Sequence, residues 1–320
     1  MSTSTERVEK IKLGVSSCLL GRQVRFDKGH KLNRYILDTL GEFFEFRGFC
    51  PEMDIGLGVP REPVRLVLDD EEIRCVGTKT PSMDVTDRLH STIGGQVGWI
   101  QELCGYILKK DSPSCGMERV KVYRNEAPEK VGVGIFAARL MQCFPELPVE
   151  EEGRLGDPRL RENFIQRVYT FYRWKILVQS GVSIQGIQKF HSQHKYILMS
   201  HSPAEAKDLG AWLSNQNESE IAQVASNYLS RMMAVLRAMA SRKNHVNTLH
   251  HIFGYLKRSL SAEDKSELLS VFEEYRLGYV PLVVPITLLR HYFRRFPNSY
   301  IQESFYMKPH PGELMLLNGI

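Results

Sequence analysis

The chain has 320 residues, of which 42% are hydrophobic and 25% are charged, with a formal net charge of +5 at pH 7. This composition is ordinary for a soluble globular protein, and the length predicts two domains. The sequence contains no internal repeat and no low-complexity tract, which argues against a fibrous or disordered chain.

The amino-terminal segment is polar and charged and lacks the apolar core of a signal peptide. No run approaches the roughly 18 apolar residues that a bilayer-spanning helix requires. We therefore expect a cytoplasmic protein with no membrane partner. In a reducing compartment, the six cysteines are expected to be free thiols or metal ligands rather than disulfides.

The charge is divided unevenly along the chain. Residues 1–157 carry 22 Lys and Arg against 25 Asp and Glu, a net charge of −3, and residues 158–320 carry 20 against 12, a net charge of +8. A basic second half indicates a polyanionic partner. The alternative is an ordinary scatter of solvated surface charge.

The first half alternates short apolar runs with helical patterns. Residues 11–21 predict a buried strand that ends in a turn, and residues 30–44 have the apolar spacing of an amphipathic helix. Residues 45–52 predict a strand that runs into a turn. Residues 64–78 predict a hairpin.

Further along, Thr86 is predicted to be the N-cap of a helix that extends to about Leu103. Residues 105–116 predict another strand followed by a turn. Residues 131–144 predict a strand, a glycine and a helix; they lack the third glycine of the dinucleotide-binding fingerprint and favour a strand-to-helix turn packed closely on the sheet. The alternation predicts an α/β fold, a Rossmann-like layer with a mainly parallel sheet.

The region 145–162 contains three prolines, two glycines and an acidic run, which indicates a domain boundary. We predict a catalytic domain at residues 1–152 and a mostly helical basic domain at residues 158–320. Within the second domain, helical patterns cover 161–179, 221–240 and 246–260 and return before Phe296, ahead of a Pro-rich aromatic tail.

Three cysteines, Cys18, Cys50 and Cys115, each follow a predicted strand and precede a Gly or Pro turn signal. Sites in such sheets form at the carboxyl ends of strands, so these thiols can converge. Three thiolates around one point describe a metal site with an open coordination position. The long intervals match no standard ligand spacing. The other cysteines fit the ordinary role of small core residues: Cys75, Cys104 and Cys143.

Several segments in order, VSSCLLG, FCPEMDIGLGVPREPVRL, DVT at 84–86 and KKDSPSCG, resemble the thiouracil desulfidase (desulfurase) family over roughly residues 10–150. The segments at 190–201 and 299–314 are similar to a helical module of formerly unknown function, which occurs alone or fused to this desulfidase. The fused arrangement is similar to that of the tRNA 4-thiouridine desulfidases.

The resemblance implies that Cys18, Cys50 and Cys115 hold a 4Fe-4S cluster through three irons and leave the fourth iron open. It also implies catalytic roles for Glu52 and for Ser112 or Ser114. The chemistry of these side chains agrees, because a carboxylate can deprotonate water and later donate a proton, and a hydroxyl can hydrogen-bond a pyrimidine edge or a developing anion. The alternative is a solvated turn carboxylate beside ordinary turn serines.

The implied activity is a non-redox, hydrolytic removal of sulfur from 4-thiouridine in tRNA, which yields uridine and hydrosulfide. A second hypothesis keeps this chemistry but takes free 2-thiouracil or thionucleosides as substrate. A third hypothesis is a non-catalytic, metal-bearing RNA-binding or stress-response protein, with zinc or a cluster as its metal.

Basic residues near aromatic ones suit phosphates and unstacked RNA bases. Such residues occur in the helical domain, and two lysines precede the third cysteine; each stretch is equally compatible with an ordinary solvated surface. The candidate RNA-binding residues are Lys109, Lys110, Arg173, Lys175, Lys189, Lys195, Arg290, Arg294 and Arg295. We expect His191, His194 and His201 to be structural or RNA-contacting, because no neighbouring carboxylate or cysteine completes a familiar metal site.

Overall fold

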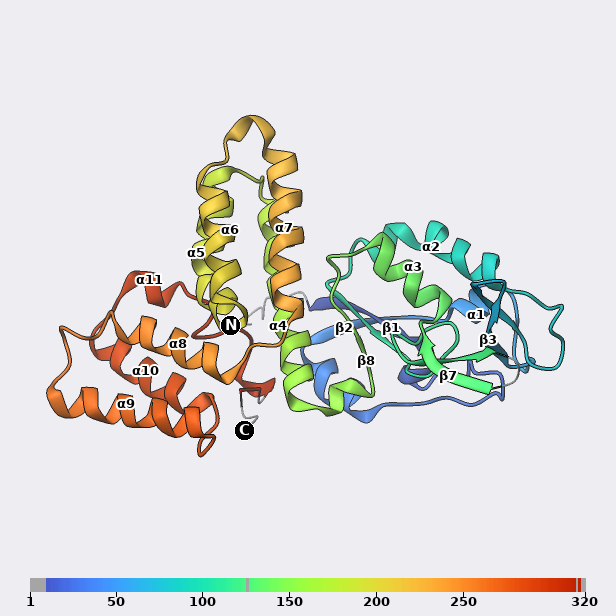
Figure 1. Cartoon of the computed structure of the whole chain (residues 1–320), viewed down its shortest axis with the longest axis horizontal. Helices are drawn as coiled ribbons and strands as arrows, with labels where there is room; N and C mark the ends of the chain where they lie inside the picture. The colour runs from blue at the N-terminus through green and yellow to red at the C-terminus, as the bar shows by residue number, and fades with distance from the viewer. Residues whose placement is uncertain (1–9, 125–126, 315, 318–320) are drawn as a thin grey trace, which may run out of the picture. The chain divides into compact units, whose positions relative to one another are not determined.

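The computed structural model describes residues 10–124, 127–314 and 316–317. These residues fall into two compact units that divide between Gly156 and Asp157 (Figure 1). We call them unit 1 and unit 2 and describe each by itself.

Unit 1 contains a parallel sheet in the order β2-β1-β5-β8. Its strands are Ile11–Ser16 (β1), Phe44–Phe49 (β2), Gly105–Leu108 (β5) and Val149–Glu151 (β8). The predicted α/β fold with a parallel sheet is confirmed. Because the strands run the same way, the chain leaves β1, β2 and β5 at one edge of the sheet.

A second sheet has the order β4-β3-β6-β7. Val64–Asp69 (β3) and Glu72–Gly77 (β4) form the predicted hairpin, in which Asp69 pairs with Glu72. Val120–Arg124 (β6) and Ala127–Gly132 (β7) form another hairpin, and β3 and β6 pair in parallel. The β6–β7 pairing was not predicted, because β7 is exposed along nearly its whole length and has no inward apolar alternation.

Two helices, Thr86–Ile100 (α2) and Ile135–Cys143 (α3), lie side by side in unit 1 (Figure 1). They cover an aromatic group in which Phe49 contacts the rings of Trp99 and Phe136 at centroid distances of 5.7 and 5.4 Å. Tyr106 of β5 adds a contact with Phe136 at 5.9 Å. These ring contacts pack the ends of β2 and β5 against α2 and α3.

The helix predicted at 30–44 is borne out only in part, because the helical turns are limited to residues 35–42 and do not form a regular α-helix. The chain forms only a π-helical turn, Tyr35–Thr39, and a 3-10 turn, Leu40–Glu42. Only Ile36 and Leu40 of these turns are fully buried, so two short turns satisfy the apolar contact that the pattern suggested.

The predicted N-cap, Thr86, is instead the first residue of α2, and Val85 occupies the N-cap position without a side-chain cap bond. The Asp84 carboxylate accepts hydrogen bonds from the Thr86 amide (2.9 Å) and hydroxyl (2.6 Å), whereas the Thr86 oxygen accepts from the Cys75 amide of β4. The helix ends at Ile100, so Cys104 lies buried in the loop before β5, and Cys143 at the end of α3 is exposed.

Unit 2 is mostly helical, as predicted. Its helices are Pro158–Gln179 (α4), Ile184–His201 (α5), Pro203–Ser214 (α6), Ile221–Arg237 (α7), Arg242–Phe253 (α8), Ala262–Leu277 (α9), Val283–Arg295 (α10) and Ser299–Gln302 (α11). Side-chain caps such as Asp157, Ser183 and Ser241 begin several of them. Helix α9 was not predicted, because only Leu268, Phe272 and Tyr275 of its face are buried.

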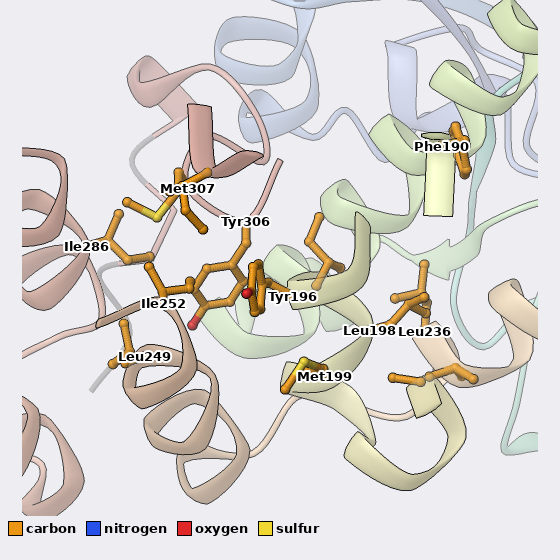
Figure 2. Packing of buried hydrophobic residues seen from close by; sticks show 14 of the residues in the cluster. Phe190, Tyr196, Leu198, Met199, Leu236, Leu249, Ile252, Ile286, Tyr306 and Met307 are labelled. Carbon is orange, nitrogen blue, oxygen red and sulfur yellow. The ribbon is translucent and has the colours of Figure 1, made fainter. Parts of the chain in front are cut away.

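One buried cluster joins these helices, and Figure 2 shows part of it. It includes Tyr196 of α5, Ile252 of α8 and Ile286 of α10, together with Tyr306 and Met307 of the segment after α11. The tail segment is therefore part of the interior of unit 2 and does not lie loosely on its surface. Among the described residues, no helix combines the length and apolarity that a bilayer crossing needs.

Candidate active site

Three loops at the carboxyl ends of β1, β2 and β5 meet around a cavity of about 180 Å³. Cys18 lies on a 3-10 turn directly after β1, Cys50 follows β2, and Cys115 lies in the loop after β5. All three side chains line this cavity. The structure thus brings together the three cysteines that the sequence separates by long intervals.

The thiols perturb one another because they are buried together. Burial, together with the charge of the neighbouring Cys50, raises the pKa of the Cys18 thiol to about 11. Burial likewise raises the pKa of Cys50 and that of Cys115. Three thiolates at this place therefore need a cation, and a metal centre provides one while lowering the pKa of its ligands. Soft sulfur donors around one cavity fit an iron-sulfur group.

Within the described ranges, no group of three or more His, Cys, Asp or Glu side chains is arranged to hold a single metal ion. The fit of the iron-sulfur group rests on the type of donor and on the shared cavity.

Glu52 lies in the first turn of the short helix Pro51–Asp54 (α1), two residues after Cys50. One carboxylate oxygen accepts a hydrogen bond from the Ser114 hydroxyl at 2.6 Å. The other accepts from Nη2 and Nε of Arg61 at 2.6 and 3.0 Å. The Glu52 side chain keeps 15% exposure and Arg61 only 5%. The carboxylate is therefore held in one orientation at the wall of the cavity.

The structure distinguishes the two serines that the sequence left equivalent. Ser112 Oγ accepts hydrogen bonds from the backbone amides of Ser114 (3.3 Å) and Cys115 (3.1 Å), so it organises the turn. Ser114 is buried and donates to Glu52, and its oxygen lies 3.0 Å from Ser112 Oγ. Because the Ser114 proton is directed at Glu52, Ser112 is the donor in the Ser112–Ser114 bond.

Arg61 is the residue that sequence reasoning missed. Besides Glu52, it donates to the carbonyls of Gly58 (2.7 Å) and Val24 (2.9 Å), which ties the loop after α1 to the loop after β1. The signal was the GLGVPRE stretch, where Gly56 and Gly58 adopt positive φ of 77° and 68° and return the chain towards the cavity.

The cysteine loop after β5 is supported by the start of α3. The amides of Ile135 and Ala137 donate to the carbonyls of Pro113 and Ser114, both at 3.1 Å. A Cβ on Gly134 would lie 2.6 Å from the Ser114 backbone, so only glycine fits there. The glycine-rich strand-to-helix turn is thus confirmed, and its close packing partner is the loop of residues 113–115.

The two lysines before Cys115 also line the cavity, but they differ in their contacts. Lys109 is largely buried and forms an ion pair with Glu152, and its amide donates to Ser16 Oγ at 3.0 Å. Lys110 has an exposed side chain, 4.0 Å from the Asp111 carboxylate. The contacts of Lys109 therefore stabilise the edge of the sheet, whereas the side chain of Lys110 is accessible to a ligand.

The candidate RNA-binding residues of unit 2 divide in the same way. Arg173 donates to the Pro309 carbonyl and lies 3.8 Å from the ring centroid of Phe305, and Arg290 donates to the Met307 carbonyl. These two arginines hold the tail segment, so we no longer expect them to be free phosphate ligands. The others differ in exposure: Lys175 is half-buried, and Lys189, Lys195, Arg294 and Arg295 are exposed.

The three histidines of α5 make ordinary interior contacts. His194 shares a hydrogen bond of 2.8 Å with the Phe190 carbonyl, and His201 contacts Gln166 at 2.7 Å. His191 lies 3.1 Å from the Tyr228 hydroxyl. Burial lowers the pKa of His194 to about 3 and those of His191 and His201 to about 4. These positions agree with the structural role expected from the sequence.

Two family models match the chain. The family described as "2-thiouracil desulfurase" matches residues 13–152, and the family described as "Protein of unknown function (DUF1722)" matches residues 195–311. The solved structure of the "[4Fe-4S]-dependent thiouracil desulfidase TudS" is 32% identical over 46% of this chain and 94% of its own length, with a TM-score of 0.38.

Two bacterial relatives each match about half of the chain. The "Uncharacterized protein YbgA" of Escherichia coli (strain K12) is 22% identical over 159 residues, which are 49% of this chain and 94% of that protein. The "Uncharacterized protein YbbK" of Bacillus subtilis (strain 168) is 29% identical over 144 residues, which are 43% of this chain and 95% of that protein. Through residues 13–152 this chain belongs to the 2-thiouracil desulfurase family, and residues 195–311 join a DUF1722 module to that domain.

Proposed function

We propose that this protein is an iron-sulfur-dependent desulfidase that removes sulfur from 4-thiouridine in tRNA by hydrolysis. The observation that carries the proposal is the cavity of unit 1, where three cysteine thiols and the Glu52–Ser114 pair lie together. The name of TudS, a [4Fe-4S]-dependent enzyme acting on thiouracil, supports the same chemistry.

Cys18, Cys50 and Cys115 would hold a 4Fe-4S cluster. When bound, the cluster would supply a soft Lewis-acidic iron suited to a thiocarbonyl sulfur. A thiol must lose its proton to bind iron, and burial raises the pKa of these thiols. The affinity of the three cysteines for the cluster should therefore rise with pH.

Glu52 is the general base and acid in this proposal. Its carboxylate takes a proton from the water that attacks the ring carbon and returns a proton to the departing sulfur. The atoms balance without an oxidant or reductant, because C=S and H₂O become C=O and hydrogen sulfide. Arg61 holds Glu52 from the side opposite Ser114, and Ser114 places a hydroxyl beside the reacting centre.

The tRNA substrate is proposed because the DUF1722 module is part of a basic region with a net charge of +8 over residues 158–320. Exposed Lys195, Arg294 and Arg295 suit phosphates. A second candidate is a free thiolated pyrimidine. The description of the family that matches residues 13–152 names 2-thiouracil.

The test uses the full chain, purified and reconstituted with iron and sulfide without oxygen. It is incubated separately with 4-thiouridine-containing tRNA and with free 2-thiouracil, and both sulfide release and loss of the near-ultraviolet thiocarbonyl absorbance are followed. We expect turnover of the tRNA. Turnover of 2-thiouracil alone would establish the second candidate.

A matched control separates cluster chemistry from non-specific sulfide release. Cys143→Ala removes an exposed cysteine outside the cavity and should leave turnover unchanged. tRNA binding without turnover of either substrate, by a protein with a full complement of iron, would favour a non-catalytic RNA-binding protein and refute the desulfidase.

A further inference from the structure

A second cavity lies in unit 2, far along the sequence from the cysteines. It is a groove of about 740 Å³ between α10, α11 and residues 303–308. Its lining includes the basic side chains of Arg290, Arg294 and Lys308 and the apolar side chains of Ile301, Phe305 and Met307. Its volume is within the range of sites that bind small organic molecules.

The groove is positively charged. Among the described residues, Arg290, Arg294 and Lys308 have no ion pair with an acidic side chain. Glu303, the acidic residue in the lining, lies 3.9 Å from Lys189 Nζ and accepts from the Gln193 amide at 3.4 Å. The negative charge of the groove is therefore already matched by Lys189, and three cations remain without a counter-ion.

Two polar atoms in the wall of the groove also lack a hydrogen-bond partner among the described residues. These atoms, Arg290 Nε and Ser304 Oγ, are buried. Arg173, beside the Phe305 ring, also has a buried Nη1 without a partner. Burial lowers the pKa of His310, and the charges of Arg173 and Arg290 lower it further. Two guanidinium groups and an imidazole thus share this region, and buried charge without a counter-ion is costly.

The wall of the groove is also rigid. Tyr306 and Met307 are buried in the same cluster as Ile252 and Ile286 (Figure 2). The Phe305 amide donates to the Gln193 carbonyl of α5 at 2.9 Å. A rigid groove binds its ligand without the entropic cost of ordering the wall.

We propose that this groove binds one unstacked nucleotide of RNA, with its phosphate near the exposed Arg294 and Lys308 and its base beside the partly exposed Phe305. The inference rests on the proposed function, because RNA is the partner proposed there. Cations beside an apolar and aromatic surface are what single-stranded nucleic acid requires, since the phosphate needs charge and the base needs a flat apolar contact. A phosphopeptide would use the cations but not the apolar wall.

The test measures binding of unmodified tRNA to the full chain, so that it does not depend on sulfur chemistry. Arg294→Gln combined with Lys308→Gln removes two exposed charges and should weaken the Kd about tenfold or more. The slope of log Kd against log salt should fall by about 1 to 2. The matched control is Lys207→Gln combined with Lys243→Gln, two exposed lysines outside the groove, which should change the Kd by less than about twofold.

A second measurement reports on the base. A single-stranded oligoribonucleotide carrying 5-bromouridine is photo-crosslinked to the full chain, and the adduct is mapped by mass spectrometry. We expect adducts within residues 293–308. Adducts elsewhere, an equal loss of affinity in both charge pairs, or competition by a phosphoserine peptide but not by oligouridylate would overturn the groove proposal.

The same variants separate this inference from the proposed function. Arg294→Gln with Lys308→Gln should turn over free 2-thiouracil at the wild-type rate if unit 1 is a desulfidase. Retained tRNA turnover with unchanged Kd would refute only the groove. Absence of tRNA binding by the wild-type chain would refute both the groove and the tRNA substrate, and absence of turnover of any thiolated pyrimidine would refute the desulfidase.

Discussion

The cavity of unit 1 and the interior of unit 2 both bury polar side chains, but they use them differently. In unit 1, Glu52 comes from the short helix α1, and Ser114 and Arg61 from two loops bond to it at the wall of a cavity. In unit 2, His194 and His201 bond to the backbone carbonyls of Phe190 and Ala238. The first arrangement leaves reactive groups facing open space, whereas the second satisfies donors within the bundle. A buried polar residue is therefore a weaker indication of a functional site than the meeting of several loops around a cavity.

Among the changes considered for the cavity of unit 1, removal of one of its three thiols should have the largest effect on activity. Cys18→Ala, Cys50→Ala or Cys115→Ala should abolish both bound iron and desulfuration, because the donor set is lost. Iron content and sulfide release measure the effect, with Cys143→Ala as the control. Full activity in any of the three cavity variants would contradict the assignment.

Glu52→Gln should lower turnover by about 10²–10⁴-fold, because the amide cannot take a proton from water. The variant should keep its iron, since Glu52 is not one of the proposed ligands. Glu45→Gln, an exposed position on β2, is the matched control and should turn over normally. Both turnover and the visible absorbance of the cluster are measured, and an active Glu52→Gln enzyme would eliminate the acid–base role.

The two serines of the loop after β5 should differ in their effect on turnover. Ser114→Ala removes the donor that orients Glu52 and should reduce turnover roughly 100-fold, the low end of the contribution of a general base or acid. Ser112→Ala removes an acceptor of two backbone amides and should act through the turn, with a smaller loss of about tenfold and less bound iron. The reverse order in kcat would show that Ser112 is the catalytic serine.

The histidines provide a prediction of stability for unit 2. Burial lowers the pKa of His191, His194, His201 and His245 to between about 3 and about 4. Such groups are neutral in the folded state, so they contribute stability above pH 6.5 that is lost as the pH falls toward the folded values. Burial of Glu162 raises its pKa to about 7, which acts in the opposite direction. Four histidines outweigh one carboxyl, so unit 2 should become less stable between pH 7 and pH 5.

Urea unfolding followed by far-ultraviolet circular dichroism, which unit 2 dominates, measures this effect. His194→Asn keeps a donor near the Phe190 carbonyl and should reduce the slope of unfolding free energy against pH. His90→Gln, an exposed position in unit 1, should leave the slope unchanged. A stability that rises as the pH falls from 7 to 5 would contradict the buried neutral state.

Local patterns were sufficient for much of the fold. Alternation around residues 64–78 predicted the β3–β4 hairpin, and helical spacing predicted α4, because both signals lie within a few residues of each other in the chain. The helix predicted at 30–44 is shorter and irregular, and the pairing of the exposed strand β7 with β6 was not predicted, because the apolar patterns of these segments do not reflect burial in the folded chain.

By itself, the sequence determined the parallel sheet of the first half, the helical second half and the three cysteines placed after strands. Only the tertiary structure decided that Arg61 holds Glu52, that Ser114 rather than Ser112 donates to it, and that Arg173 and Arg290 hold the tail segment. The physical reason is distance along the chain. Strand and helix patterns come from neighbours, whereas a hydrogen bond between Ser114 and Glu52 spans 62 residues and exists only after two loops have met at one edge of a sheet.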